Sequence, residues 1–100
     1  MDRKKALNLL GLAYRAKKVV CGEENVLMNL RSGKCKVVLV ASDASSRTID
    51  NFQRKCFFYN APLVLEFNCE ELSKSLGKGM VKIITLTDDG FCKAFLENLK

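Results

Sequence analysis

A continuous apolar run, Val37 to Ala41, limits the folds open to this chain more than any other feature. Together with Lys36 before it, the run reads Lys-Val-Val-Leu-Val-Ala and contains no polar alternation. A strand with one face in water alternates apolar and polar residues, whereas a strand covered on both faces is apolar throughout. The run therefore predicts a buried strand in a sheet that carries helices above and below it.

Helical and extended patterns alternate along the rest of the 100 residues. Besides the strand at 36–41, extended segments are expected at 19–20, 63–67 and 81–86. Helices are expected at about 3–16, between Gly22 and Gly33, at about 46–59, between Asn68 and Gly77, and after Gly90. Short links, without repeats or low-complexity tracts, connect these segments. The order predicts a single domain, residues 1–100, folded as a three-layer α/β/α sandwich on a four-stranded, mixed or mostly parallel sheet.

Several residues predict local features of these elements. Gly33 is placed where a left-handed helix cap would fall, and Asn68 and Glu71 have the spacing of a capping box. Gly11 lowers helix propensity by about 1 kcal/mol relative to alanine, so we expect it at a place of close packing. On the helix at 46–59, the inner face is expected to carry Ile49, Phe52, Cys56 and, as a further candidate, Phe57.

Composition excludes several classes of protein. The five cysteines are scattered, no Cys-x-x-Cys pair occurs and histidine is absent, so we expect reduced thiols, no disulfide, no metal site and no cofactor. No run reaches the roughly 18 apolar residues of a membrane helix, and the first residues lack the apolar core of a signal peptide. We therefore expect a cytoplasmic protein that is not membrane-bound.

The charge of the chain favours an anionic partner. The net charge is +6, and residues 1–55 hold twelve Lys or Arg against five Asp or Glu, which gives +7 for this part. Residues 56–100 hold five against six, which gives −1. A one-sided basic excess is typical of proteins that bind polyanions such as nucleic acid, although many inert proteins are basic too.

The turn at Gly22 is the strongest candidate for a binding site. The N–H groups at the start of a helix lack partners and carry partial positive charge, so a helix that begins after Gly22 can dock a nucleic-acid backbone. Basic residues precede and follow this unit along the chain, namely Lys17, Lys18, Arg31, Lys34 and Lys36. The plainer interpretation is a strand-to-helix turn with a solvated basic rim. In open α/β sheets, ligands lie outside the carboxyl ends of the strands, which favours the Gly22 end.

Catalysis has little support. The acidic pairs Glu23-Glu24 and Asp88-Asp89 start predicted helices, where carboxylates act as caps and dipole partners. Cys21 would be reactive if the helix end lowered the pKa of its thiol, but a small apolar filler is the simpler role. We therefore predict that the protein is not an enzyme.

The stretch from Lys17 to Ala41 resembles the family of kink-turn RNA-binding proteins. This family includes large-subunit ribosomal proteins, components of box C/D and H/ACA ribonucleoproteins, and small bacterial relatives. The shared frame is lysine before a glycine, Gly22, then an amphipathic helix, Gly33 and a buried strand that runs into Ser42-Asp43. Over nearly the whole chain the resemblance is to bacterial YlxQ-type ribosomal proteins.

The resemblance implies a role for individual residues. In this family the residues after the glycine contact sheared G·A pairs of a kinked RNA helix, and nearby lysines hold phosphates. Members that bind kink-turns tightly carry Asn, then Glu, at the second and third places after the glycine and Lys at the sixth; here these places hold Glu24, Asn25 and Met28. The implied RNA-binding set is Lys17, Lys18, Gly22, Glu23, Glu24, Asn25, Met28, Lys34 and Lys78.

Three hypotheses follow from this set. The leading one is a monomeric, non-enzymatic RNA-binding protein whose partners are ribosomal or other structured RNA and ribosome or ribonucleoprotein components. The main alternative is a protein-interaction module with weak or no RNA binding, favoured by the acidic Glu23-Glu24 pair and by Met28 in place of lysine. A small-ligand or redox enzyme that uses Cys21 is the third.

Overall fold

Strand β2 (Val37–Val40) lies in the middle of a mixed four-stranded sheet, and all four of its residues are buried. In this computed structural model, which describes residues 1–100, the strands lie in the order β1 (Val19–Cys21), β4 (Ile83–Leu86), β2 and β3 (Leu63–Val64). Strand β4 pairs antiparallel with β1 and with β2, while β2 and β3 are parallel. Strands β1, β2 and β3 therefore point in one direction, and β4 points in the other. In chain order the elements are α1 (Arg3–Arg15), β1 (Val19–Cys21), α2 (Glu23–Arg31), β2 (Val37–Val40), α3 (Ser46–Phe58), β3 (Leu63–Val64), α4 (Cys69–Leu76), β4 (Ile83–Leu86) and α5 (Asp89–Glu97).

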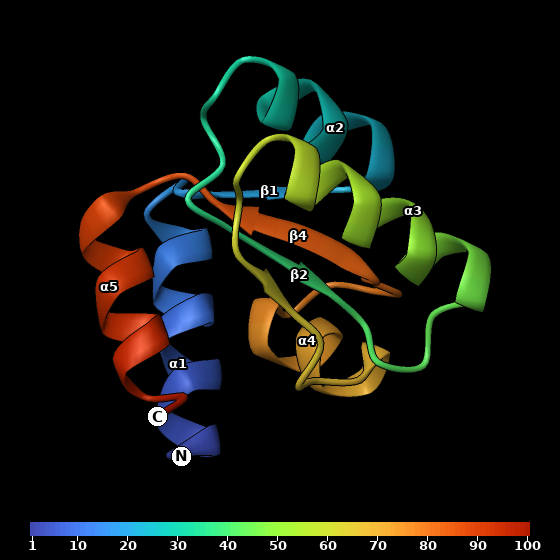
Figure 1. The fold of residues 1–100 in the computed structure, drawn as a ribbon. Coiled ribbons are helices and arrows are strands. Elements are labelled where there is room, and N and C mark those ends of the chain that lie inside the picture. Colours follow the sequence, from blue (N-terminus) through green and yellow to red (C-terminus); the bar gives the residue numbers. More distant parts are fainter.

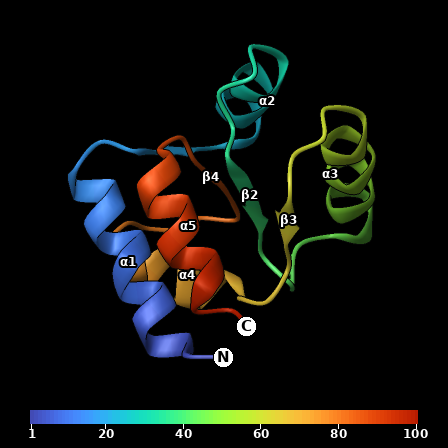
Figure 2. The same cartoon turned by 60° about the vertical axis from the view of Figure 1, so that its left-hand side comes forward.

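Helices cover both faces of the sheet, which confirms the predicted α/β/α sandwich. Helices α1, α4 and α5 lie on one face, and α2 and α3 lie on the other (Figures 1 and 2). Helix α1 packs against both α4 and α5, so these three helices form a single layer. The two chain ends lie close together beside α1 and α5 (Figure 1).

A single core cluster of 23 buried residues fills the space between the layers. The phenylalanines Phe52, Phe67 and Phe95 are among its largest fully buried side chains. Thr85 is the one buried polar residue, and its hydroxyl donates a hydrogen bond to the Val37 carbonyl at 2.8 Å. This bond satisfies the hydroxyl inside the sheet, so the core holds no buried side-chain N or O atom without a partner.

The local predictions at Gly33, Asn68 and Gly11 are confirmed. Gly33 has a φ of +73°, and Asn68 and Glu71 form the reciprocal bonds of a capping box. At Gly11 a Cβ atom would lie 2.6 Å from the backbone oxygen of Ser75. The glycine therefore allows α1 and α4 to approach backbone to backbone.

Phe57 corrects the predicted inner face of the helix at 46–59. The ring is 86% exposed, whereas Phe52 and Cys56 are buried as expected. A helix turns about 100° per residue, so the position after Cys56 is carried away from the core stripe. The prediction for Phe57 was wrong.

Candidate functional site

The carboxyl ends of β1, β2 and β3 meet at one edge of the sheet, which we call the carboxyl edge. Helix α2 starts there at Gly22, and the loop between α4 and β4 returns to the same place (Figure 1). The N–H of Gly22 donates to the carbonyl of Ile83 at 3.0 Å, and the N–H of Ala41 donates to the carbonyl of Lys82 at 2.7 Å. These bonds hold the start of α2 beside the loop that leads into β4.

Gly22 forms a turn that leaves the start of α2 open. Its φ of 97° and ψ of 146° lie in a region that is essentially restricted to glycine. No side chain caps this helix, and residues 23–25 are exposed. The first N–H groups of a helix have no intrahelical acceptor, so this end presents free donors to a ligand.

Asn25 is held across the turn, next to two exposed carboxylates. Its Nδ2 donates to the carbonyl of Cys21 at 3.1 Å, which leaves its side-chain oxygen available as an acceptor. Glu23 and Glu24 are exposed in the first turn of the helix. An amide and carboxylates placed in this way can pair with the edges of nucleobases.

Lys78, one of the residues predicted for the site, lies at the carboxyl edge. A further part of the site, which the sequence did not indicate, lies beside it. A hollow of about 220 Å³ is bordered by Cys21, Gly22, Lys78, Met80 and Lys82, among other residues. Met80 is 79% exposed, and the N–H of Val81 donates to Ser73 Oγ at 2.9 Å, which anchors the loop. Met80 and Lys82 were missed because only the pairing of β4 between β1 and β2 brings them to Gly22.

Lys17, Lys18 and Lys34 flank this unit along the chain, but the fold does not bring them to the Gly22 turn itself. The carbonyl of Lys18 accepts bonds from the N–H and the hydroxyl of Thr87, beyond the far end of β4. Four residue steps along β1 separate Lys18 from Gly22 by about 13 Å. Lys34 follows the opposite end of α2, a helix about 14 Å long.

At the edge of the sheet opposite to the carboxyl edge, the local environments of Lys17, Met28 and Lys34 differ. Lys17 ends α1 in the left-handed conformation, with a φ of +63°. Met28 is 62% exposed and borders a shallow hollow together with Arg31 and Lys34, near the end of α2. Met28 and Lys34 are therefore neighbours, but they lie apart from the other predicted residues at the start of the helix.

Nothing in the arrangement supports catalysis. Burial raises the pKa of the half-buried Cys21 thiol, and the nearby charge of Lys78 opposes this only in part. A raised pKa reduces the fraction of the nucleophilic thiolate. All five cysteines are free thiols, and no cluster of three or more metal-ligating side chains occurs. No helix combines the length and the hydrophobicity that crossing a membrane would require.

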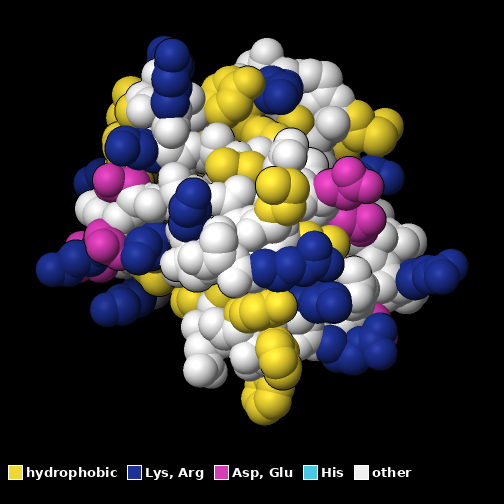
Figure 3. All heavy atoms as spheres, turned by 90° about the horizontal axis from the view of Figure 1, so that it is seen from above, with side chains coloured by type: hydrophobic (Ala, Val, Ile, Leu, Met, Phe, Trp, Pro, Cys, Tyr) yellow, Lys and Arg dark blue, Asp and Glu magenta, His cyan; other side chains and the backbone are white.

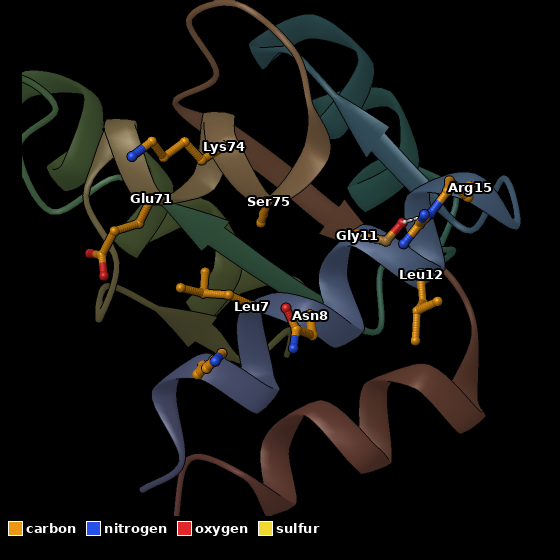
Figure 4. Close-up of a pocket in the computed structure, with 9 residues that line it drawn as sticks. Leu7, Asn8, Gly11, Leu12, Arg15, Glu71, Lys74 and Ser75 are labelled. Carbon is orange, nitrogen blue, oxygen red and sulfur yellow. Dashed lines mark hydrogen bonds between the residues drawn. The ribbon is translucent and has the colours of Figure 1, made fainter.

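The largest hollow, of about 590 Å³, lies away from Gly22, between α1 and α4 (Figure 4). Around it, Arg15 Nε contacts the Gly11 carbonyl at 3.4 Å, and Glu71 pairs with Arg3 at 2.8 Å. Ser75 donates its hydroxyl proton to the Leu72 carbonyl at 3.0 Å, and no hydrogen bond joins it to a basic side chain. The hollow marks the close approach of the two helices and has no catalytic pair.

Comparison with known proteins identifies the family of the chain. The profile of the ribosomal protein L7Ae/L30e/S12e/Gadd45 family matches residues 4–96. The chain belongs to this family. Over 92 residues it is 39% identical to the RNA-binding protein YlxQ of Enterococcus faecium, and the aligned region covers 92% of this chain and 88% of the relative. It is 38% identical over 91 residues to the RNA-binding protein YlxQ of Bacillus subtilis (strain 168), covering 91% of each chain.

Two solved structures share the fold. A protein of unknown function from Bacillus halodurans superposes with a TM-score of 0.91 at 33% identity, covering 95% of this chain and 96% of that one. The 15.5kD RNA binding protein of Giardia lamblia superposes with a TM-score of 0.79 at 18% identity, covering 96% and 82%. The two YlxQ relatives are named as RNA-binding proteins, which is the class of protein that the sequence predicts.

Proposed function

We propose that this protein binds structured, kink-turn-like RNA through the carboxyl edge and acts with the ribosome or another ribonucleoprotein in the cytoplasm. The observation that carries the proposal is the open start of α2 at Gly22, held beside the loop with Lys78 and Lys82. Two relatives at 38–39% identity are named RNA-binding proteins, which supports the same class of ligand. The protein would bind as a monomer.

The residues divide into two roles under this proposal. Lys78, Lys82 and the free N–H groups of α2 hold phosphates, and such contacts position the RNA without reading its sequence. Glu24 and Asn25 pair with base edges, and each good pairing is worth about 1–3 kcal/mol of discrimination.

The remaining predicted residues take part only if the RNA extends beyond the Gly22 turn. Lys17, Lys18 and Lys34 lie at the opposite edge, so only an RNA that runs along α2 reaches them. Met28 lies on the same path, near Lys34. Restoring a cation with Met28→Lys would tighten binding if a phosphate passes this point.

A protein-interaction module remains the second candidate. The exposed Met28 and the acidic Glu23 and Glu24 favour it, because carboxylates repel phosphates and an exposed methionine suits an adaptable apolar contact. The two candidates differ in salt dependence, since RNA binding through phosphates weakens steeply as salt rises.

The test is a titration of each variant against a kink-turn RNA and a mismatched RNA at two salt concentrations. Lys78→Ala together with Lys82→Ala should weaken both RNAs about equally and reduce the salt slope by about one unit per lost contact. Asn25→Ala should weaken the kink-turn RNA and spare the mismatched one. Lys93→Ala, an exposed lysine of α5, is the matched control. Equal binding by the double variant and the control would contradict the proposal.

A further inference from the structure

Three consecutive aromatic residues are exposed where α3 ends. Phe57 is 86% exposed, Phe58 77% and Tyr59 36%. The rings of Phe58 and Tyr59 meet edge to face, with centroids 4.9 Å apart. Single exposed apolar residues are ordinary, but a cluster of aromatic rings on the surface of so small a protein marks an interaction site.

Phe58 is the last member of a stripe, otherwise made of polar residues, that follows the outer face of α3. Arg47, Asn51, Arg54 and Phe58 are spaced by four, three and four residues, which places them on one face of a helix. The opposite face carries the buried Phe52 and Cys56. The stripe is therefore directed to solvent, where Figures 1 and 2 show α3 on the outside of the sheet.

Two hollows make this stripe continuous with the carboxyl edge. The first, of about 500 Å³, is bordered by Glu23 of α2 and by Arg47, Thr48, Asn51 and Arg54. The second, of about 460 Å³, is bordered by Asn51, Arg54, Lys55, Phe58 and Tyr59. They share Asn51 and Arg54, so one track leads from the start of α2 along α3, whose 13 residues span about 20 Å.

The charges on this track favour an anionic, base-bearing ligand. Arg47 and Lys55 form no ion pair in the structure, and Arg54 contacts only the exposed Asp50, at 3.3 Å. Exposed pairs of this kind are weak, so Arg54 is available to a phosphate. Glu23 is the one carboxylate that borders either hollow. In the view from above, basic and hydrophobic side chains lie side by side, and acidic ones gather in few places (Figure 3).

We propose that this stripe of α3 is a second RNA-binding surface, which takes single-stranded nucleotides that continue from RNA docked at the carboxyl edge. Phe58 stacks on an unpaired base, and the amide of Asn51 bonds to a base edge. Arg47, Arg54 and Lys55 hold phosphates. Aromatic rings interleaved with cations are the chemistry by which proteins hold single strands. The continuity with the carboxyl edge rests on the function proposed above, but the stripe itself can be tested without it.

A single strand fits these observations better than a protein partner does. The fully buried centre of a protein interface is apolar and depleted of charge. Here Asn51, Arg54 and Lys55 border the same hollow as Phe58, and no aliphatic side chain does. In a two-fold contact with a second copy of this chain, Arg54 and Lys55 would also lie near the same cations of the partner.

The experiment uses the full chain and three probes: a blunt kink-turn RNA, the same RNA with a single-stranded uridine tail of about eight nucleotides, and that tail alone. Phe58→Ala should weaken binding of the tailed RNA and of the free tail by about 5- to 150-fold, the range that corresponds to one base–aromatic stack. Binding of the blunt RNA should not change. Phe58→Tyr should restore the affinity, because a phenol ring also stacks.

Phe57→Ala is the matched control, because its ring is more exposed than Phe58 but borders neither hollow. It should leave all three RNAs bound as before. The proposal is overturned if Phe58→Ala binds the tailed RNA and the free tail like wild type. It is also overturned if Phe58→Ala instead converts a dimer into a monomer in sedimentation. Binding of the free tail that depends on Phe58, with no binding of the blunt RNA, would keep this inference and refute the function proposed above.

Discussion

Replacing Gly22 by alanine tests whether the open turn at the carboxyl edge needs its unusual backbone. Gly22 has a φ of 97° and a ψ of 146°, and a Cβ atom added there would meet only Asn25 Nδ2, at 3.8 Å. That is an ordinary van der Waals distance, so the penalty comes from the backbone angles alone. A side chain held in such a region costs about 1–3 kcal/mol.

The expected net effect on stability is smaller than this strain. Alanine also reduces the freedom of the unfolded chain, which offsets about 0.4–1 kcal/mol. The free energy of unfolding of Gly22→Ala should therefore fall by about 1–2 kcal/mol, which lowers the urea midpoint by about 1 M. Relief of the strain would move Asn25 and the free N–H groups of α2, so affinity for kink-turn RNA should fall as well.

The assay is urea unfolding followed by circular dichroism, with an RNA titration of the folded variant. Gly79→Ala is the control, because Gly79 has no positive φ and a Cβ atom there would meet nothing within 4 Å. This control should be neutral or slightly stabilised. A Gly22→Ala protein with the unfolding midpoint of this control and the RNA affinity of wild type would refute the reasoning.

Three further predictions concern stability. Gly11→Ala should lower the free energy of unfolding by about 1–3 kcal/mol despite its better helix propensity, because the new methyl group would lie 2.6 Å from the Ser75 carbonyl oxygen; denaturant unfolding measures this. Asn68→Ala should cost about 0.5–2 kcal/mol by removing the cap of α4, and an unchanged unfolding midpoint would contradict it. The Arg3 guanidinium and the Asn68 N–H lower the pKa of the Glu71 carboxyl group in the folded protein. The ionised carboxylate therefore stabilises the fold above pH 4.5, and this contribution is lost as the pH falls through the pKa of the folded state. Arg3→Met should therefore lose less stability than wild type between pH 6 and pH 3 in thermal melts.

Much of the architecture could be predicted because its signals are local. The unbroken run at Val37–Ala41 indicated a strand covered on both faces, and its residues are buried. The capping box at Asn68 depends on two side chains three residues apart, which a sequence displays directly. Gly11 was expected at a close contact because a glycine inside a helix costs propensity, but the partner, Ser75, could only come from the structure.

The layout of the site could not be predicted because it depends on the order and direction of the strands. Nothing in the residues of β4 shows that it pairs between β1 and β2, antiparallel to both. That pairing brings Met80 and Lys82 to Gly22 and leaves Lys18 at the opposite edge. Residues close in sequence were assumed to be close in space, and a strand between them was enough to separate them.

The most direct test of the proposed RNA surface is an NMR titration of the full chain with a kink-turn RNA. If the RNA docks at the carboxyl edge, the backbone amide signals that shift should cluster at residues 22–25 and 78–82. Signals of α5, which lies on the face of the sheet opposite to α2, should stay in place. Shifts confined to α1 and α5, or no shifts at RNA concentrations that saturate a kink-turn-binding relative, would contradict the central claim.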